Sequence, residues 1–155
     1  MIDDATCDTI DLVRIVLDTS VLVAALRSST GAAAENVRLA LLREITTLMD
    51  FKLICEYRDV ALRTEHLIAS GKTHRETALI LDALEAVAEP VLVVTRYHPL
   101  SQDANDDMVL DVAINGAADA IVTANTRHFR EPARRFQVDV LTPAELLHDF
   151  RKRRG

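Results

Sequence analysis

Arg14-Ile15-Val16-Leu17-Asp18-Thr19-Ser20 sets the fold class of this chain. Its apolar residues do not alternate with polar ones, which is typical of a strand buried on both faces of a parallel sheet. Asp18 closes the run, and in open α/β sheets ligands bind in the crevice beyond the carboxyl ends of the strands. We therefore expect a central strand whose end places a carboxylate at that edge. Capping of the next helix is the alternative role for Asp18.

Strand-like and helical segments alternate along the rest of the sequence. We expect further buried or edge strands at 45–49, 91–94, 119–125 and 138–141. Helical periodicity and helix-start signals predict helices at 21–26, 32–43, 51–63, 73–88, 103–117 and 142–154. Residues 127–130 are interpreted as a short connection, with a break at Pro132. This order predicts an α/β fold with three layers, α/β/α, around a central, mostly parallel sheet of four to five strands.

Length and composition indicate one domain with an aliphatic core. The chain has 155 residues, of which 49% are hydrophobic and 4% aromatic, with no Trp. We expect an acidic leader at 1–13, the domain at 14–150 and a basic tail at 151–155. The scarcity of aromatic residues disfavours recognition of single-stranded bases by stacking alone.

Charge and cysteine usage bear on partners and compartment. The net charge of −6 is not the basic footprint of a general nucleic-acid binder. A divalent cation held by the acidic residues would reverse the field locally. Cys7 and Cys55 match no metal-ligand or redox spacing, which favours a reducing compartment. No apolar run reaches the length of a membrane span, so we expect a cytoplasmic protein without membrane contact.

Oxygen-bearing side chains gather at the predicted carboxyl edge of the sheet. Asp18 and Asn125 each close a strand, and Asp106 continues the inward stripe of the helix at 103–117 by one turn. A helical wheel places Val109, Ala113, Gly116 and Ala117 on that inward face. The same wheel places the other polar residues of the helix outward, namely Asp107, Asp111 and Asn115. Hard oxygen ligands that converge in one cleft suit Mg²⁺ or Mn²⁺.

Glu56 has an ordinary explanation in the pattern of its own helix. Together with Lys52, Asp59 and Arg63 it forms one face with the spacing of exposed ion pairs. From this pattern alone we would assign Glu56 to a solvated surface.

Four segments, in this order and spacing, carry a resemblance to a known family: 15–23 (IVLDTSVLV), 55–60 (CEYRDV), 103–110 (DANDDMVL) and 120–129 (AIVTANTRHF). The chain resembles the PIN-domain family from about residue 14 to residue 146. Within that family it is similar to the VapC-like ribonuclease toxins of toxin–antitoxin systems.

The resemblance implies a metal-dependent endoribonuclease in which acidic residues hold Mg²⁺ or Mn²⁺. Matched by motif position, the catalytic and metal-binding acids are Asp18, Glu56 and Asp106, with Asp107 as the competitor for the third position. Asn125 occupies the position of the fourth acid and would be a weaker, uncharged ligand, which leaves open whether one metal or two are bound. Ser20 and Thr123 match small hydroxyl residues that would orient the ligands.

The resemblance also implies partners, and a different class of function stays open. It implies an RNA substrate, a cognate antitoxin protein and a homodimer. Arg127 is a candidate contact for RNA phosphate, whereas His98 and His128 are expected to be bystanders. The alternative is a catalytically weak or inactive module that binds RNA or a protein partner, with Asn125 marking the lost chemistry. A dinucleotide-binding fold is disfavoured because none of the four glycines makes a Gly-rich turn.

Overall fold

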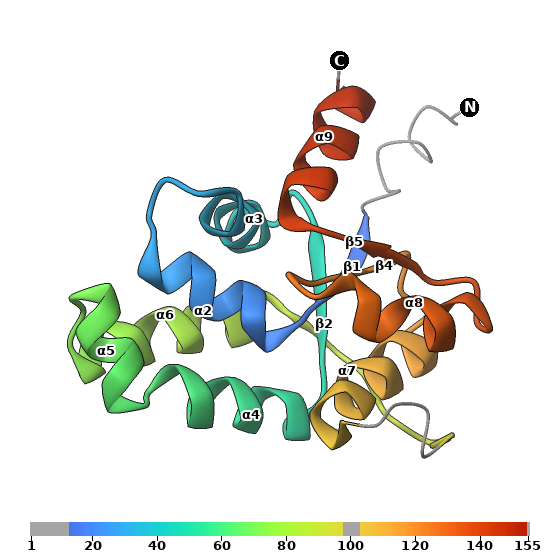
Figure 1. The fold of residues 1–155 in the computed structure, drawn as a ribbon, viewed down its shortest axis with the longest axis horizontal. Coiled ribbons are helices and arrows are strands. Elements are labelled where there is room, and N and C mark those ends of the chain that lie inside the picture. Colours follow the sequence, from blue (N-terminus) through green and yellow to red (C-terminus); the bar gives the residue numbers. More distant parts are fainter. Residues whose placement is uncertain (1–12, 98–102, 155) are drawn as a thin grey trace.

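The computed structural model describes residues 13–97 and 103–154 (Figure 1). The strands are β1 (Arg14–Leu17), β2 (Thr46–Met49), β3 (Glu89–Pro90), β4 (Ala120–Val122) and β5 (Asp139–Leu141). The helices are α2 (Thr19–Arg27), α3 (Ala32–Leu41), α4 (Phe51–Ala61), α5 (Thr64–Ser70), α6 (His74–Val87), α7 (Ala104–Asn115), α8 (Thr126–Arg134) and α9 (Pro143–Arg154). The predicted leader at 1–13 lies almost entirely outside the described residues, as do Cys7 and His98.

The five strands form one parallel sheet in the order β3-β2-β1-β4-β5. β1 is central and pairs with β2 on one side and with β4 on the other. Figure 1 shows α2 to α6 on one side of the sheet and α7 and α8 on the other. The predicted three-layer α/β/α fold with a parallel sheet is therefore confirmed, and β5 is an edge strand as expected.

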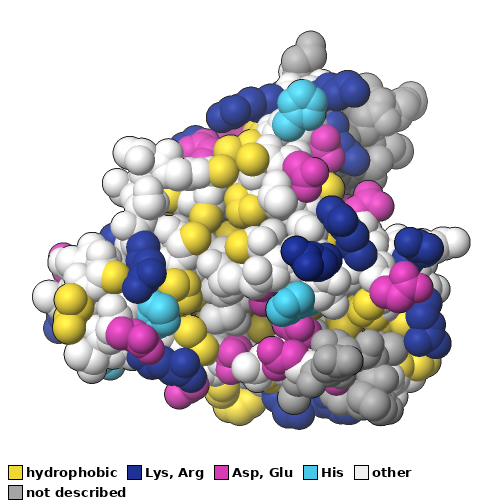
Figure 2. Space-filling model, viewed as in Figure 1, with side chains coloured by type: hydrophobic (Ala, Val, Ile, Leu, Met, Phe, Trp, Pro, Cys, Tyr) yellow, Lys and Arg dark blue, Asp and Glu magenta, His cyan; other side chains and the backbone are white. Residues whose placement is uncertain are grey.

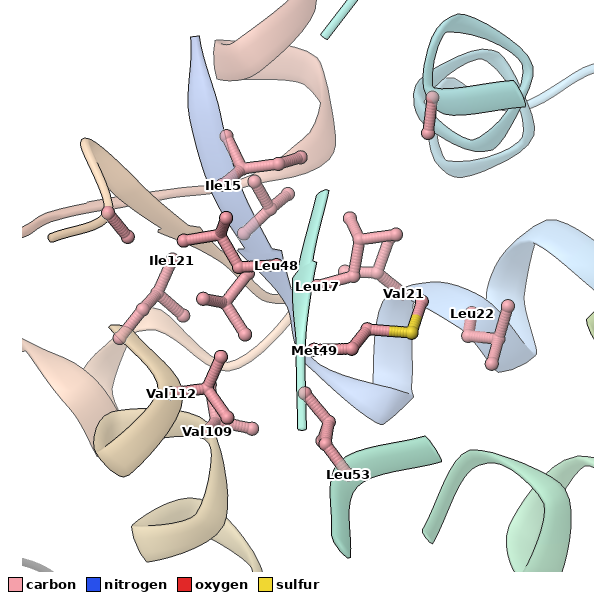
Figure 3. Packing of buried hydrophobic residues seen from close by; sticks show 14 of the residues in the cluster. Ile15, Leu17, Val21, Leu22, Leu48, Met49, Leu53, Val109, Val112 and Ile121 are labelled. Carbon is pink, nitrogen blue, oxygen red and sulfur yellow. The ribbon is translucent and has the colours of Figure 1, made fainter. Parts of the chain in front are cut away.

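The core surrounds β1 on both of its faces. Ile15, Val16 and Leu17 are completely buried, as the absence of alternation predicts. Figure 3 shows Val109 and Val112 of α7 beside the strands on one side, and side chains of α2 and α4 on the other. Because both faces are covered, the end of β1 is held firmly, and Asp18 directly follows it.

Tyr57 ties α4 to the end of β1. Its side chain is completely buried, and its hydroxyl donates a 2.6 Å hydrogen bond to the carbonyl oxygen of Leu17. Burial raises the pKa of Tyr57 well above its ordinary range, and the charges of Asp18 and Asp50 raise it further. The neutral phenol therefore persists as a donor and fixes α4, which carries Glu56, against the residue before Asp18.

Tyr57→Phe is expected to lower the free energy of unfolding by about 1 kcal/mol, because a buried carbonyl loses its donor while the ring is kept. Urea unfolding followed by circular dichroism measures the change. Tyr97→Phe is the matched control, since Tyr97 is 44% exposed and packs its ring against Phe136 at 4.9 Å. Equal stability of the two variants would contradict the anchoring role of Tyr57.

The prediction of a buried strand at 91–94 is wrong. β3 lies two residues earlier, where Glu89 pairs with Leu48 and Pro90 with Met49. Leu92 and Val94 are exposed to 81% and 74%. β3 is a sheet edge, so the apolar run after it extends past the neighbouring strand and is not enclosed. Pro90 is compatible with this place because an edge strand can leave one N–H side unpaired.

Two helices differ from the sequence prediction. Residues 64–70 form α5, which was not predicted, and 126–134 form α8, so the predicted connection at 127–130 is wrong. The expected break at Pro132 is also absent, since Pro132 lies inside α8 and is buried. Burial of one side of this short helix outweighs the hydrogen bond that the proline removes.

Within the described ranges, no helix combines the length and the apolar composition that crossing a lipid bilayer requires.

Candidate active site

Asp18 lies at the carboxyl end of the central strand and is held by two hydroxyl groups. Its Oδ2 accepts hydrogen bonds from Ser20 Oγ at 2.6 Å and from Thr123 Oγ1 at 2.8 Å. Ser20 reaches back from the first turn of α2, and Thr123 follows β4, the neighbour of β1. Asp18 also precedes α2, yet its side chain makes no capping hydrogen bond. The capping alternative for Asp18 is therefore wrong.

The two hydroxyl groups are themselves fixed by the backbone that follows β4. Ser20 Oγ accepts from the backbone N–H of Ala124 at 3.2 Å, and Thr123 Oγ1 accepts from that of Asn125 at 2.9 Å. Thr123 is completely buried. Ser20 and Thr123 thus orient the Asp18 carboxylate, as the motif positions imply, and link it to the loop that carries Asn125.

Glu56 lies on α4 in a half-buried position, and other acidic residues lie close enough to affect its pKa. Burial raises its pKa, and the negative charges of Asp59, Asp103 and Asp18 raise it further, against the lowering effect of Arg63. Arg63 forms its ion pair with Asp59, at 3.0 Å. The structure thus brings Glu56 within electrostatic reach of Asp18, although its helix face predicted an ordinary surface residue.

Asp106 lies in the first turn of α7 and is buried, with 8% of its surface exposed. Its pKa is raised by burial and by the charges of Asp103 and Asp18. His128 lowers that pKa in part, because its Nδ1 lies 3.3 Å from Asp106 Oδ2. The inward position of Asp106 is confirmed, and His128, expected to be a bystander, contacts it.

The outward placement of the remaining polar residues on α7 is wrong. Asp107 and Asp111 are 3% and 1% exposed, and Asn115 is half-buried. The segment after β3 covers the face that the wheel assigned to solvent. Arg96 contacts Asp111 at 3.0 Å, and Asn115 Oδ1 accepts hydrogen bonds from the backbone N–H groups of 94 and 95. Ala117, predicted inward, is exposed.

Asp103 is a charged neighbour of the site that sequence reasoning missed. It precedes α7, and its Oδ1 accepts a hydrogen bond from the backbone N–H of Asn105 at 2.9 Å. Its charge raises the pKa values of both Glu56 and Asp106. A role at the start of α7 is enough to explain Asp103 in the sequence. Its proximity to Glu56 and Asp106 becomes visible in the folded structure.

Asn125 and Arg127 lie at the start of α8, beside a hollow of about 510 Å³ that residues 124–128 line. Both side chains are exposed. Asn125 is the residue before α8, and its side chain makes no capping hydrogen bond. The amide oxygen of Asn125 therefore stays available to a ligand. Asn125 lies in the same loop as Thr123, which donates a hydrogen bond to Asp18.

The residue types suit a hard divalent cation, although the side chains are not gathered into a ready-made cage. In the ranges 13–97 and 103–154, no three His, Cys, Asp or Glu side chains are placed so that they could hold a metal ion as they stand. Asp18, Glu56 and Asp106 nevertheless offer carboxylate oxygens, and the negative charge of Asp18 repels those of both Glu56 and Asp106 across the sheet edge. A cation would relieve this repulsion, so the donor set fits Mg²⁺ or Mn²⁺ after side-chain movement.

Glu56→Gln is expected to raise the melting temperature at pH 7.5 in EDTA. A raised carboxyl pKa means that the folded chain binds more protons than the unfolded chain between the ordinary and the raised pKa. Stability therefore falls as the pH rises through that window, and the charge of Glu56 destabilises the fold above it. The gain in melting temperature should shrink as the pH falls toward about 4. Thermal unfolding followed by circular dichroism at both pH values measures it.

Glu76 provides a control of opposite sign. Its pKa is lowered because its carboxylate accepts a hydrogen bond from the backbone N–H of Thr73 in a capping box. The stabilisation by Glu76 is present above its ordinary pKa and is lost as the pH falls through the lowered one. Glu76→Gln is therefore expected to lower the melting temperature at pH 7.5. A decrease for Glu56→Gln as well would contradict repulsion at the site.

Comparison with known proteins agrees with this geometry. The family model described as PIN domain matches residues 14–127, which include Asp18, Glu56, Asp106, Asn125 and Arg127. No curated protein matches the chain. The match covers well over half of the 155 residues, so the chain belongs to the PIN domain family, whose members are in general nucleases.

Proposed function

We propose that this protein is a metal-dependent endoribonuclease that hydrolyses RNA phosphodiester bonds at the edge formed by Asp18, Glu56 and Asp106. The observation that carries the proposal is that Asp18, directly after β1, lies close enough to Glu56 on α4 and to Asp106 on α7 for its charge to raise the pKa values of both, in addition to the larger effect of burial. Perturbed carboxylates that converge from separate elements are typical of functional sites. PIN domains are in general nucleases, so membership of this family supports a nuclease function for the site.

Each acid has a distinct part in this proposal. Asp18 is fixed through Oδ2 by Ser20 and Thr123, which leaves Oδ1 for a Mg²⁺ or Mn²⁺ ion. Glu56 and Asp106 complete the carboxylate set, with Asn125 as the weaker neutral ligand. A bound ion would supply activation of water and stabilisation of negative charge on the scissile phosphate. The raised pKa values of Glu56 and Asp106 make both carboxylates better proton acceptors than an ordinary surface acid.

We further propose that the protein acts in the cytoplasm as the toxin of a toxin–antitoxin pair. The resemblance of the four segments to VapC-like toxins supports this, and the free, exposed Cys55 suits a reducing compartment. Exposed apolar side chains near β3, namely Phe51, Leu92 and Val94, favour an interface with a second copy or with a cognate antitoxin. Light scattering after size exclusion tests the homodimer, and a monomer at micromolar concentration would contradict it.

The function is tested with purified protein and a pool of single-stranded and structured RNA. Cleavage is expected with Mn²⁺ or Mg²⁺ and is expected to disappear with EDTA. Cleavage that persists at full rate in EDTA would contradict metal dependence. Sequencing of the cut ends from an active reaction then defines the substrate.

The second candidate is a binding module with little or no catalysis. Asn125 at the fourth acid position favours it, because an amide brings no charge to a second cation. The contact between His128 and Asp106 at 3.3 Å also favours it, since the histidine occupies an oxygen that a cation would need. A folded protein that binds RNA but cleaves none with either metal would establish this function instead.

A further inference from the structure

A row of arginines lies along the exposed face of α8. Arg127, Arg130 and Arg134 follow one another at spacings of three and four residues, which places them on one side of a helix. All three are exposed, whereas Phe129 and Ala133 on the opposite side are buried. We define these three residues as the α8 arginine face.

Helix stability does not account for this arrangement as a whole, since only Arg134, in the last turn, suits the helix dipole. Like charges three and four residues apart repel each other, and a cation in the first turn, where Arg127 lies, opposes the helix dipole. Among the described residues, one carboxylate contacts this face: Glu131 approaches Arg134 at 3.8 Å, and the side chain of Glu131 is 80% exposed. In a chain of net charge −6, such a face suits an anion from outside.

The fold joins this face to the proposed active site. α8 begins directly after Asn125, and its His128 contacts Asp106. One hollow, of about 510 Å³, lies at Arg127, and a second, of about 430 Å³, is lined by Arg130 and Arg134 together with Asp139 of β5. Figure 2 shows Lys and Arg side chains beside a group of acids on this side of the molecule.

From these observations we infer that the α8 arginine face binds the phosphate backbone of the RNA on one side of the cleaved bond. The inference rests on the proposed ribonuclease function and adds to it the path that the RNA backbone takes across the protein surface. Nine residues of helix extend over about 13 Å, enough to follow the backbone beyond the nucleotide at the site. Guanidinium groups bind phosphate through charge-assisted hydrogen bonds and carry no base preference, so the face supplies affinity and not sequence specificity.

The test is the double variant Arg130→Ala, Arg134→Ala in the full chain, with a fluorescent 12-nucleotide single-stranded RNA as the probe. Anisotropy in EDTA is expected to show a Kd raised about tenfold. The slope of log affinity against log salt concentration is expected to become shallower by about 1.4, which is two lost phosphate contacts on a single strand. With metal, KM should rise while kcat stays unchanged, because the lost contacts lie away from the reacting atoms.

The matched control is Arg27→Ala, Arg75→Ala, which removes the same charge from exposed residues of α2 and α6 on the other side of the sheet. Equal Kd values and salt slopes for the two double variants would overturn the inference, even if the wild type cleaves RNA. Selective loss of affinity for a polyglutamate peptide, with RNA binding unchanged, would overturn it in favour of an acidic protein partner. If the wild type cleaves no RNA but the Arg130→Ala, Arg134→Ala variant still binds RNA more weakly than the wild type, the result would support RNA binding by the α8 arginine face. It would at the same time refute the proposed nuclease function.

Discussion

Asp18→Asn is expected to reduce metal-dependent RNA cleavage at least 100-fold while leaving the fold intact. The side chain keeps its shape, so the hydrogen bonds to Ser20 and Thr123 can persist with an amide oxygen as acceptor. What is lost is the negative charge at the end of the central strand, which the proposed cation needs. Initial cleavage rates at saturating Mn²⁺ measure the effect, and circular dichroism verifies the fold.

Asp50→Asn is the matched control for Asp18. Asp50 also follows a buried strand, β2, and its Oδ1 accepts a hydrogen bond from the backbone N–H of Leu53 at the start of α4. Asn caps helices as well as Asp does, so this variant removes one charge from the same sheet edge without loss of the cap. Its cleavage rate is expected to stay within a few-fold of the wild type. Comparable losses in both variants would refute a specific role for Asp18.

Asp106→Asn is expected to reduce cleavage at least 100-fold, and Asp107→Asn much less. Both carboxylates are buried in the first turn of α7, so burial does not separate them. The charge of Asp18 raises the pKa of Asp106, which places Asp106 with the other acids of the site. Cleavage rates and melting temperatures of the two variants, measured together, separate a catalytic effect from a structural one.

A reversed pattern would assign the third acid to Asp107. Because Asp107 is only 3% exposed, its substitution is expected to act on the free energy of unfolding in the first place. Loss of cleavage by Asp107→Asn with unchanged stability, together with an active Asp106→Asn, would show that Asp106 is buried near the site without serving in cleavage.

The centre of the fold follows from local sequence patterns, since burial on both faces suppresses polar alternation. β1 is therefore recognisable from Ile15, Val16 and Leu17, and with it the position of Asp18. The edges depend on tertiary packing instead. The apolar run at 91–94 could not be distinguished from a buried strand, because only the order of strands shows that β3 is an edge.

The acidic residues of the site also divide into those that local sequence patterns identify and those whose placement depends on tertiary packing. A helical wheel assumes that one side of a helix faces solvent, and it failed for Asp111 because Arg96, on the segment after β3, covers that side. Glu56 and Asp103 each had a sufficient local explanation, as an exposed helix face and as a helix start. The approach of Glu56 to both Asp18 and Asp103 depends on contacts between distant segments, such as the hydrogen bond from Tyr57 to Leu17, and no local pattern carries that information.

Binding of Mn²⁺ to the wild type, to Asp18→Asn and to Asp50→Asn, followed by electron paramagnetic resonance, tests most directly whether the acids at the sheet edge hold the ion that RNA hydrolysis requires. The wild type and Asp50→Asn should bind Mn²⁺ with equal affinity, over the concentration range in which cleavage appears, and Asp18→Asn should bind it at least tenfold more weakly. Equal affinity of all three proteins for Mn²⁺ would contradict a metal site at Asp18.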